Sequence, residues 1–209
     1  MLGTHDLPLF IASGLLLNVT PGADTVYIAS RSMSQGVRAG MAAALGIGLG
    51  CWVHILAAAL GLSAILAASA LAFGLVKLVG AAYLVYLGLS MWRARAPADA
   101  GVVTAARAPM RKVFLQGFLT NALNPKVALF FLAFMPQFIE STAAHKPLAF
   151  VFLGAIFDFN ATLWCLFLAW ATASARSIGI GRRTRAWLSR SVGALFILLG
   201  LRLALAERG

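Results

Sequence analysis

Two polar motifs interrupt long apolar segments of this chain, and their residue types could bind a charged solute. The first contains Asn18, Pro21, Gly22 and Asp24. Pro21 lacks a backbone N–H and displaces the carbonyl four residues earlier, so it breaks a helix. The helix that restarts after it has a positive N-terminal end, which suits a carboxylate. We therefore expect a bent helix whose break carries one acid and can receive an anionic group.

A second motif has the same combination of asparagine, proline and a charged residue, but its charge is positive. It contains Asn121, Asn124, Pro125 and Lys126. Lys126 lies about twelve residues from either end of its apolar segment. At a rise of about 1.5 Å per residue, its ammonium group cannot easily reach the membrane surface. We expect it to pair with an acid of the bundle, Asp24 or Asp158, or to hold a carboxylate of the solute.

A further acid, Asp158, occupies the middle of another apolar segment. We predict that Asp158 or Asp24 binds and releases a proton, while the alternative is that Asp158 is a structural partner of Lys126 or Lys77. Charged side chains inside lipid cost about 2.5–3.5 kcal/mol on the insertion scale, so their presence points to a function. Three other polar residues could take accessory roles: His54, Lys77 and Asn160.

The composition excludes an ordinary soluble fold. The chain is 61% hydrophobic and only 11% charged, whereas soluble domains carry about 25% charged residues. The formal net charge of +11 comes largely from basic residues in short connections between apolar runs, which indicates membrane topology rather than nucleic-acid binding. We expect no cofactor and no resident metal, because the sequence lacks a Walker motif and a Cys/His ligand cluster.

Six segments are long and apolar enough to cross a bilayer, which takes about 20 residues each. They cover residues 7–29, 40–66, 70–92, 113–138, 148–172 and 188–207. We predict an all-α membrane protein in which residues 1–209 form a single transmembrane domain. Its first repeat covers about 7–92, a basic linker about 93–112 and its second repeat about 113–207. Because each repeat has an odd number of spans, the second enters the membrane inverted, and the broken helices 1 and 4 correspond.

The basic residues predict the orientation of these spans. They gather after the first, third and fifth spans, beginning with Arg31 and Arg38. By the positive-inside rule, these connections face the cytoplasm and both termini face the periplasm. The second span is rich in glycine at positions 46, 48 and 50. Such glycines allow close helix contact, either within the bundle or in a homodimer.

Taken together, these motifs resemble the LysE/RhtB family of bacterial amino-acid exporters. The resemblance runs from about residue 10 to 207, and the chain departs from the common pattern at Ala23, often a second proline, and at Cys51, often an acid. It rests on stretches 20–24, 30–40, 44–46, 77–88, 114–117 and 130–138, with His54, Asn121 and the triplet Asn124-Pro125-Lys126. It implies secondary-active export of an amino acid or close derivative across the inner membrane, in exchange for protons.

The charges of the two motifs favour a zwitterionic solute. We expect Asp24 or Asp158 to hold its ammonium, and Lys126, the Asn amides and the helix end after Pro21 to hold its carboxylate. Two alternatives remain open at this point: an exporter of a metal cation or organic anion, and a thiol–disulfide carrier that uses Cys51 and Cys165. The second is disfavoured because neither cysteine belongs to a C-x-x-C motif.

Overall fold

We analysed a computed structural model of the chain, which describes residues 2–62, 107–140 and 142–174, together with the single residues 78, 82, 85, 86, 89, 197 and 201. Almost all of the predicted spans 70–92 and 188–207 lie outside the described residues, as does Lys77. The other four predicted spans are described, except for residues 63–66 at the end of the second.

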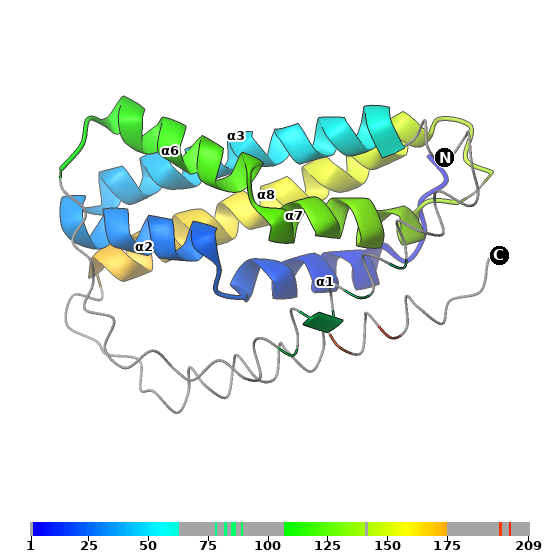
Figure 1. Cartoon of the computed structure of the whole chain (residues 1–209), viewed down its shortest axis with the longest axis horizontal. Coiled ribbons are helices and arrows are strands. Elements are labelled where there is room, and N and C mark those ends of the chain that lie inside the picture. The colour runs from blue at the N-terminus through cyan, green and yellow to red at the C-terminus, as the bar shows by residue number, and fades with distance from the viewer. Residues whose placement is uncertain are drawn as a thin grey trace.

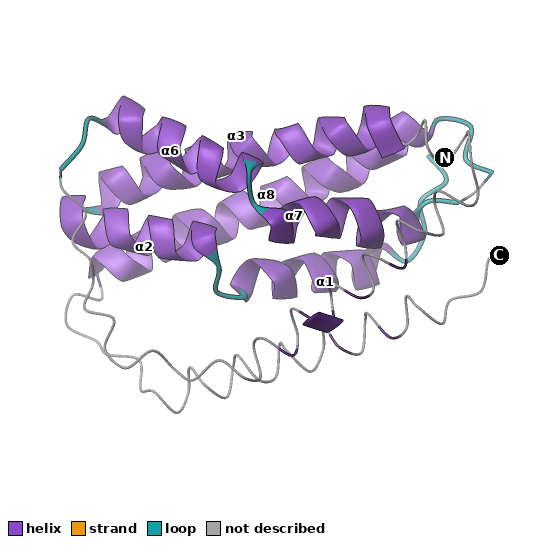
Figure 2. Ribbon diagram, in the orientation of Figure 1, coloured by secondary structure: helices purple, strands orange, loops and turns teal. Residues whose placement is uncertain are grey.

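The described part is a bundle of helices (Figures 1 and 2). Its first half contains α1 (Leu7–Val19), α2 (Ala23–Gln35) and α3 (Val37–Ala57), which continues into the π-helical turn η1 (Ala58–Leu62). Its second half contains α6 (Met110–Ala122), α7 (Pro125–Leu129), the π-helical turn η2 (Phe130–Phe134), the 3-10 turn η3 (Met135–Phe138) and α8 (Lys146–Ser174).

Two helical segments of this part, Val37–Gly61 and Lys146–Ser174, are long and apolar enough to cross a membrane without interruption. Two further candidates are bent pairs, α1 with α2 at 53° and α6 with α7 through η3 at 42°. Both bends occur at the predicted proline motifs, because neither Pro21 nor Pro125 can donate a backbone hydrogen bond. The predicted breaks in the first and fourth spans are thus confirmed.

The predicted end of the first span is wrong. The α2 helix continues to Gln35, so Arg31 lies within it, 8% exposed, and not in a connecting loop. Its guanidinium donates to the side chains of Gln35 and Gln116 at 3.0 and 2.8 Å. These bonds engage both terminal nitrogens of the guanidinium inside the bundle. The chain then turns at Gly36, whose φ of 88° suits glycine.

Glycines bring α3 and α6 into backbone contact. A side chain at Gly46 would collide with the carbonyl of Phe114, and one at Gly117 would meet the carbonyl oxygen of Ala43 at 2.5 Å. Gly50 similarly faces the carbonyl of Phe118. Gly48 faces Thr162 of α8 instead. The glycine-rich face of α3 therefore packs inside the bundle.

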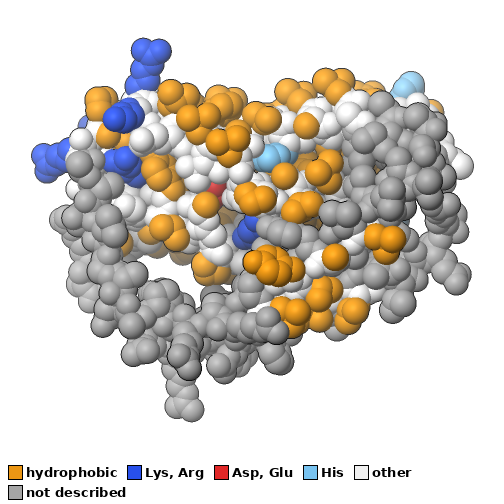
Figure 3. Space-filling model, in the orientation of Figure 1, with side chains coloured by type: hydrophobic (Ala, Val, Ile, Leu, Met, Phe, Trp, Pro, Cys, Tyr) orange, Lys and Arg blue, Asp and Glu red, His pale blue; other side chains and the backbone are white. Residues whose placement is uncertain are grey.

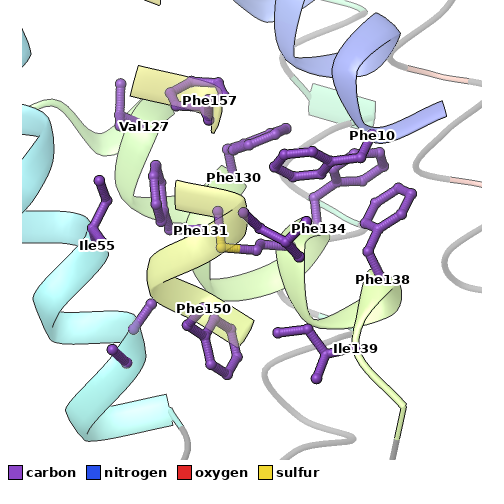
Figure 4. Packing of buried hydrophobic residues seen from close by; sticks show 14 of the residues in the cluster. Phe10, Ile55, Val127, Phe130, Phe131, Phe134, Phe138, Ile139, Phe150 and Phe157 are labelled. Atoms are coloured by element: carbon purple, nitrogen blue, oxygen red, sulfur yellow. The ribbon is translucent and has the colours of Figure 1, made fainter. Parts of the chain in front are cut away.

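The buried side chains form two separate cores. The larger is aromatic and joins α1, the end of α3, the segment from α7 to η3, and the first half of α8 (Figure 4). The smaller joins α2, the start of α3, α6 and the second half of α8, and includes Ile28, Ile47 and Val113. The two proline breaks lie between the cores, so each bent span contributes one half to each core.

The same division is visible along the length of the molecule. In Figure 1, α2 and α6 lie toward one end and α1 and α7 toward the other, while α3 and α8 run past both. Lys and Arg side chains gather at the end formed by α2 and α6, and apolar side chains cover much of the remaining described surface (Figure 3). The exposed basic residues at that end are Arg38, Arg107, Arg111 and Lys112.

Candidate functional site

The two helix breaks meet at Asp24, which belongs to the first turn of α2. Its Oδ2 atom accepts hydrogen bonds from the side-chain amides of Asn121 at 2.9 Å and Asn124 at 3.1 Å. A carboxylate at this position also faces the positive end of the α2 dipole. The residues that sequence reasoning selected from the two halves are therefore in direct contact.

Lys126 contacts the first break through its backbone. Its Nζ atom donates to the carbonyl oxygens of Leu17 at 2.8 Å and Thr20 at 2.9 Å. In an unbroken helix, Leu17 would receive its bond from the N–H of residue 21, which a proline lacks. The ammonium group replaces that donor and neutralises the negative C-terminal end of α1. The expected ion pair of Lys126 with Asp24 or Asp158 does not form among the described residues.

The side chain of Asn124 makes hydrogen bonds to both broken spans. It is the N-cap of α7, where its Oδ1 atom accepts from the backbone N–H of Lys126 at 3.0 Å. Its amide nitrogen is then directed to Asp24. One side chain thus starts a helix and orients the carboxylate of another, which explains why an asparagine is needed there.

The second break is held by His54 of α3. Its Nε2 atom lies 2.9 Å from the carbonyl oxygen of Asn121, four residues before Pro125. The His54 side chain is buried, and its ring stacks on Phe131 with centroids 6.1 Å apart. His54, which the sequence suggested as an accessory residue, thus contacts the backbone of the second motif.

A cavity of about 40 Å³ lies where the breaks meet. Water needs about 10–15 Å³ by this measure, so the cavity has room for a few waters and not for a free amino acid. Its polar lining includes the predicted residues Asn18, Gly22, Asp24, Asn121, Asn124, Lys126 and Asp158. A cavity of this size would have to widen to admit an amino acid.

Four buried side-chain atoms at this cavity have no hydrogen-bond partner within the described part of the chain. They are Asn18 Nδ2, Asp24 Oδ1, Asn121 Oδ1 and Asp158 Oδ1. Unsatisfied buried polar groups cost free energy, commonly about 1–3 kcal/mol each, so native proteins keep few of them without a use. The cavity therefore offers three hydrogen-bond acceptors and one donor to a molecule that itself carries donors and acceptors.

Asn160 does not belong to this cavity, although it is only two residues from Asp158. Two residues along a helix correspond to about 200° of rotation, so the two side chains leave α8 on different faces. Thr162, one turn beyond Asp158, does line the cavity, as do Thr25, Ile47 and Gly48. Helical periodicity around Asp158 could have identified Thr162, whereas nothing in the sequence distinguished Ile47.

Cys51 and Cys165 also line the cavity, from α3 and α8 respectively. Both are buried free thiols. Across the described ranges, no group of three His, Cys, Asp or Glu residues could hold a metal ion. The site therefore presents thiols, amides and carboxylates without a metal-ligand cluster in that part of the chain.

Residues 15–207 match the model of the family described as LysE type translocator. The chain belongs to this family. Members of the LysE family are transporters and not enzymes. The family match covers both proline breaks and every residue predicted at the site.

Curated relatives align with this chain over nearly their whole length. An uncharacterized membrane protein of Vibrio cholerae is 34% identical over 97% of this chain and 98% of its own. The homoserine/homoserine lactone efflux protein of Salmonella typhimurium is 30% identical over 95% of each chain. The leucine efflux protein of the same organism is 26% identical over 93% of this LysE family chain and 92% of its own. No solved structure matches this chain.

Proposed function

We propose that this LysE family protein exports a zwitterionic amino acid, or a close derivative, across the bacterial inner membrane in exchange for protons. The observation that carries the proposal is the meeting of two broken spans at one cavity, one bringing Asp24 and the other Lys126. Broken helices in membrane proteins are tolerated where the freed groups face a solute site. The named efflux of leucine and homoserine by relatives supports the same solute class.

The solute's ammonium group fits the acceptor side of the cavity. Asp24 Oδ1, Asn121 Oδ1 and Asp158 Oδ1 are all buried and have no hydrogen-bond partner among the residues that the structure describes. An ammonium group has three N–H donors and no acceptor, so it can satisfy up to three such oxygens. Charge-assisted hydrogen bonds of this kind are stronger than neutral ones.

The solute's carboxylate fits the opposite, donor side. Asn18 Nδ2 is buried and has no partner within the described part of the chain, and Gly22 is the N-cap of α2 and offers no side-chain cap. The first amides of that helix therefore remain available to an anion. Lys126 uses two of its three N–H groups on carbonyls, which leaves one for the carboxylate.

Proton exchange requires an acid that alternates between its protonated and deprotonated forms. Asp24 is fixed by two amides through Oδ2, whereas Asp158 lies beside Cys51 and Thr162 in the same cavity. We assign the exchange to these two carboxylates: one releases a proton as the ammonium binds and takes one up as the solute leaves. Inverted repeats would expose the site alternately to the two faces, with the basic end cytoplasmic and both termini periplasmic.

Transport in proteoliposomes tests this assignment. The purified protein should exchange leucine or homoserine across the membrane, and an imposed pH gradient should drive net uptake of either. Asp24→Asn should abolish transport, while Asp158→Asn should preserve exchange but remove the effect of the gradient. Asp6→Asn is the matched control, because Asp6 is an exposed acid outside the helices. Near-wild-type transport by Asp24→Asn would refute the site.

A further inference from the structure

Pro125 leaves the carbonyl of Asn121 without its normal helical donor. In an unbroken helix that carbonyl would accept from the N–H of residue 125, and a proline has none. The N–H of Asn124 bonds to it at 2.8 Å, which closes a tight turn. The second lone pair of the oxygen is taken by His54 Nε2 at 2.9 Å. A side chain from α3 thus completes the hydrogen bonding of the break.

The proton position on His54 follows from this contact. A carbonyl oxygen can only accept, so Nε2 must carry the hydrogen. The imidazole is buried, and its stacking on Phe131 restricts its rotation. A ring fixed in this way holds the Asn121 carbonyl at a defined distance from α3.

Asn121 is also a ligand of Asp24. Its backbone oxygen contacts His54 and its side-chain amide donates to Asp24 Oδ2 at 2.9 Å. The position of the backbone determines where that amide can reach, and Asn124 belongs to the same short turn. His54 therefore acts on the carboxylate through a chain of two hydrogen bonds, without touching the solute cavity, whose lining does not include it.

We propose that His54 is a positioning residue of the transport site, which fixes the α6–α7 break so that Asn121 and Asn124 hold Asp24 in its binding orientation. The inference rests on the proposed function in taking Asp24 as the solute ligand. It assigns His54 a hydrogen-bonding role that does not require the side chain to carry a proton through the transport cycle.

Two substitutions separate positioning from proton transfer. Gln places an N–H near the position of Nε2 and cannot titrate near neutral pH, whereas Leu removes the donor. His54→Leu should raise KM about three- to tenfold, the factor equivalent to the net contribution of one hydrogen bond. His54→Gln should restore most of that loss and keep the wild-type dependence of transport on pH. A His54→Gln variant with normal binding but no response to a pH gradient would overturn the proposal.

A double-substitution cycle locates the effect. If His54 acts through Asn121, the rise in KM caused by His54→Leu should shrink in an Asn121→Ala background, because the amide that it positions is then absent. Equal effects in both backgrounds would contradict that route.

The tautomer of His54 provides a readout that needs no solute. Nitrogen-15 NMR of histidine-labelled protein at mildly alkaline pH should show the Nε2–H tautomer for the histidine signal that His54→Gln removes from among the three. An Nδ1–H tautomer would overturn the inference even if His54→Leu fails to fold. If the wild type transports no amino acid but the tautomer is as expected, then the proposed function fails while the His54 contact stands.

Discussion

The ammonium nitrogen of Lys126 lies 2.8 Å from the carbonyl oxygen of Leu17, which cannot receive a hydrogen bond from Pro21. His54 has the reciprocal relation to Asn121, whose carbonyl precedes Pro125 by four residues. Lys126 belongs to the second half and stabilises the break of the first, while His54 belongs to the first half and stabilises the break of the second. Each half thus supplies a donor for the proline-interrupted helix of the other.

Lys126→Met should destabilise the protein, because it leaves the carbonyls of Leu17 and Thr20 without their side-chain donor. A buried group left unsatisfied costs about 1–3 kcal/mol. We expect a lower midpoint of unfolding in detergent together with loss of transport, and a smaller loss of stability for Lys126→Arg, which retains donors. Lys112→Met is the control, since Lys112 is exposed in the first turn of α6. Equal stability of the Met variants at 126 and 112 would contradict the capping role.

Gly46→Ala and Gly117→Ala should separate α3 from α6. The added methyl group would collide with a backbone carbonyl at either position, and backbone cannot move aside as a side-chain end can. Overpacking of this kind costs about 1–3 kcal/mol, so we expect a clear fall in thermal stability. Gly61→Ala is the matched control, since nothing lies within 4 Å of the added atom. Comparable melting temperatures for all three variants would show that the helices are not so closely packed.

Side-chain hydrogen bonds, which we call the clasp, join α2 to α6 and the residues before it at the basic end of the bundle. The side chain of Gln116 accepts from Arg31 Nη2 at 2.8 Å and from Tyr27 Oη at 3.2 Å. Gln35 adds a bond to the carbonyl of Ala108 at 2.9 Å. This clasp, Tyr27, Arg31, Gln35 and Gln116, lies on the same helices as the smaller core.

Gln116→Leu should loosen that end, because it removes the acceptor of Arg31 Nη2, whereas Tyr27 keeps its bond to the carbonyl of Val113 at 2.8 Å. We expect a membrane-impermeant thiol reagent to label Cys165, a member of the smaller core, faster from the side of the basic connections. Gln137→Leu is the control at the other end, since its amide bonds only to carbonyls of its own segment, Ala133 and Phe134. An unchanged rate in Gln116→Leu would show that the clasp does not limit access.

The two cavity thiols should report solute binding without taking part in transport. Cys51 and Cys165 are only 2% and 8% exposed and both line the cavity. Bound amino acid should therefore slow their alkylation. The double variant with Ser at both positions should still transport and should lose inhibition by the reagent. Loss of transport both with Ser and with Ala at these two positions would instead favour a thiol–disulfide carrier.

The sequence alone was sufficient to predict membrane helices, the two breaks and the inventory of polar residues at them. These properties are local: a run of apolar residues predicts a span, and a proline removes one donor at a known place. The glycines of the second span predicted close helix contact, but not whether the contact was internal. Arg31 was misplaced because charge alone indicated a loop, and its hydrogen-bond acceptor Gln116 is 85 residues away.

The tertiary structure decided which of these polar groups touch. The bonds of the site that connect the two halves join residues 67 to 109 positions apart, from His54–Asn121 to Lys126–Leu17. Such pairings depend on the rotation and register of packed helices, which no local pattern specifies. The sequence suggested an ion pair between Lys126 and an acid, whereas packing gave the ammonium two carbonyls and gave Asp24 two amides. Composition thus determined that charges lie inside the membrane bundle, and the geometry of the two broken helices determined how each is satisfied.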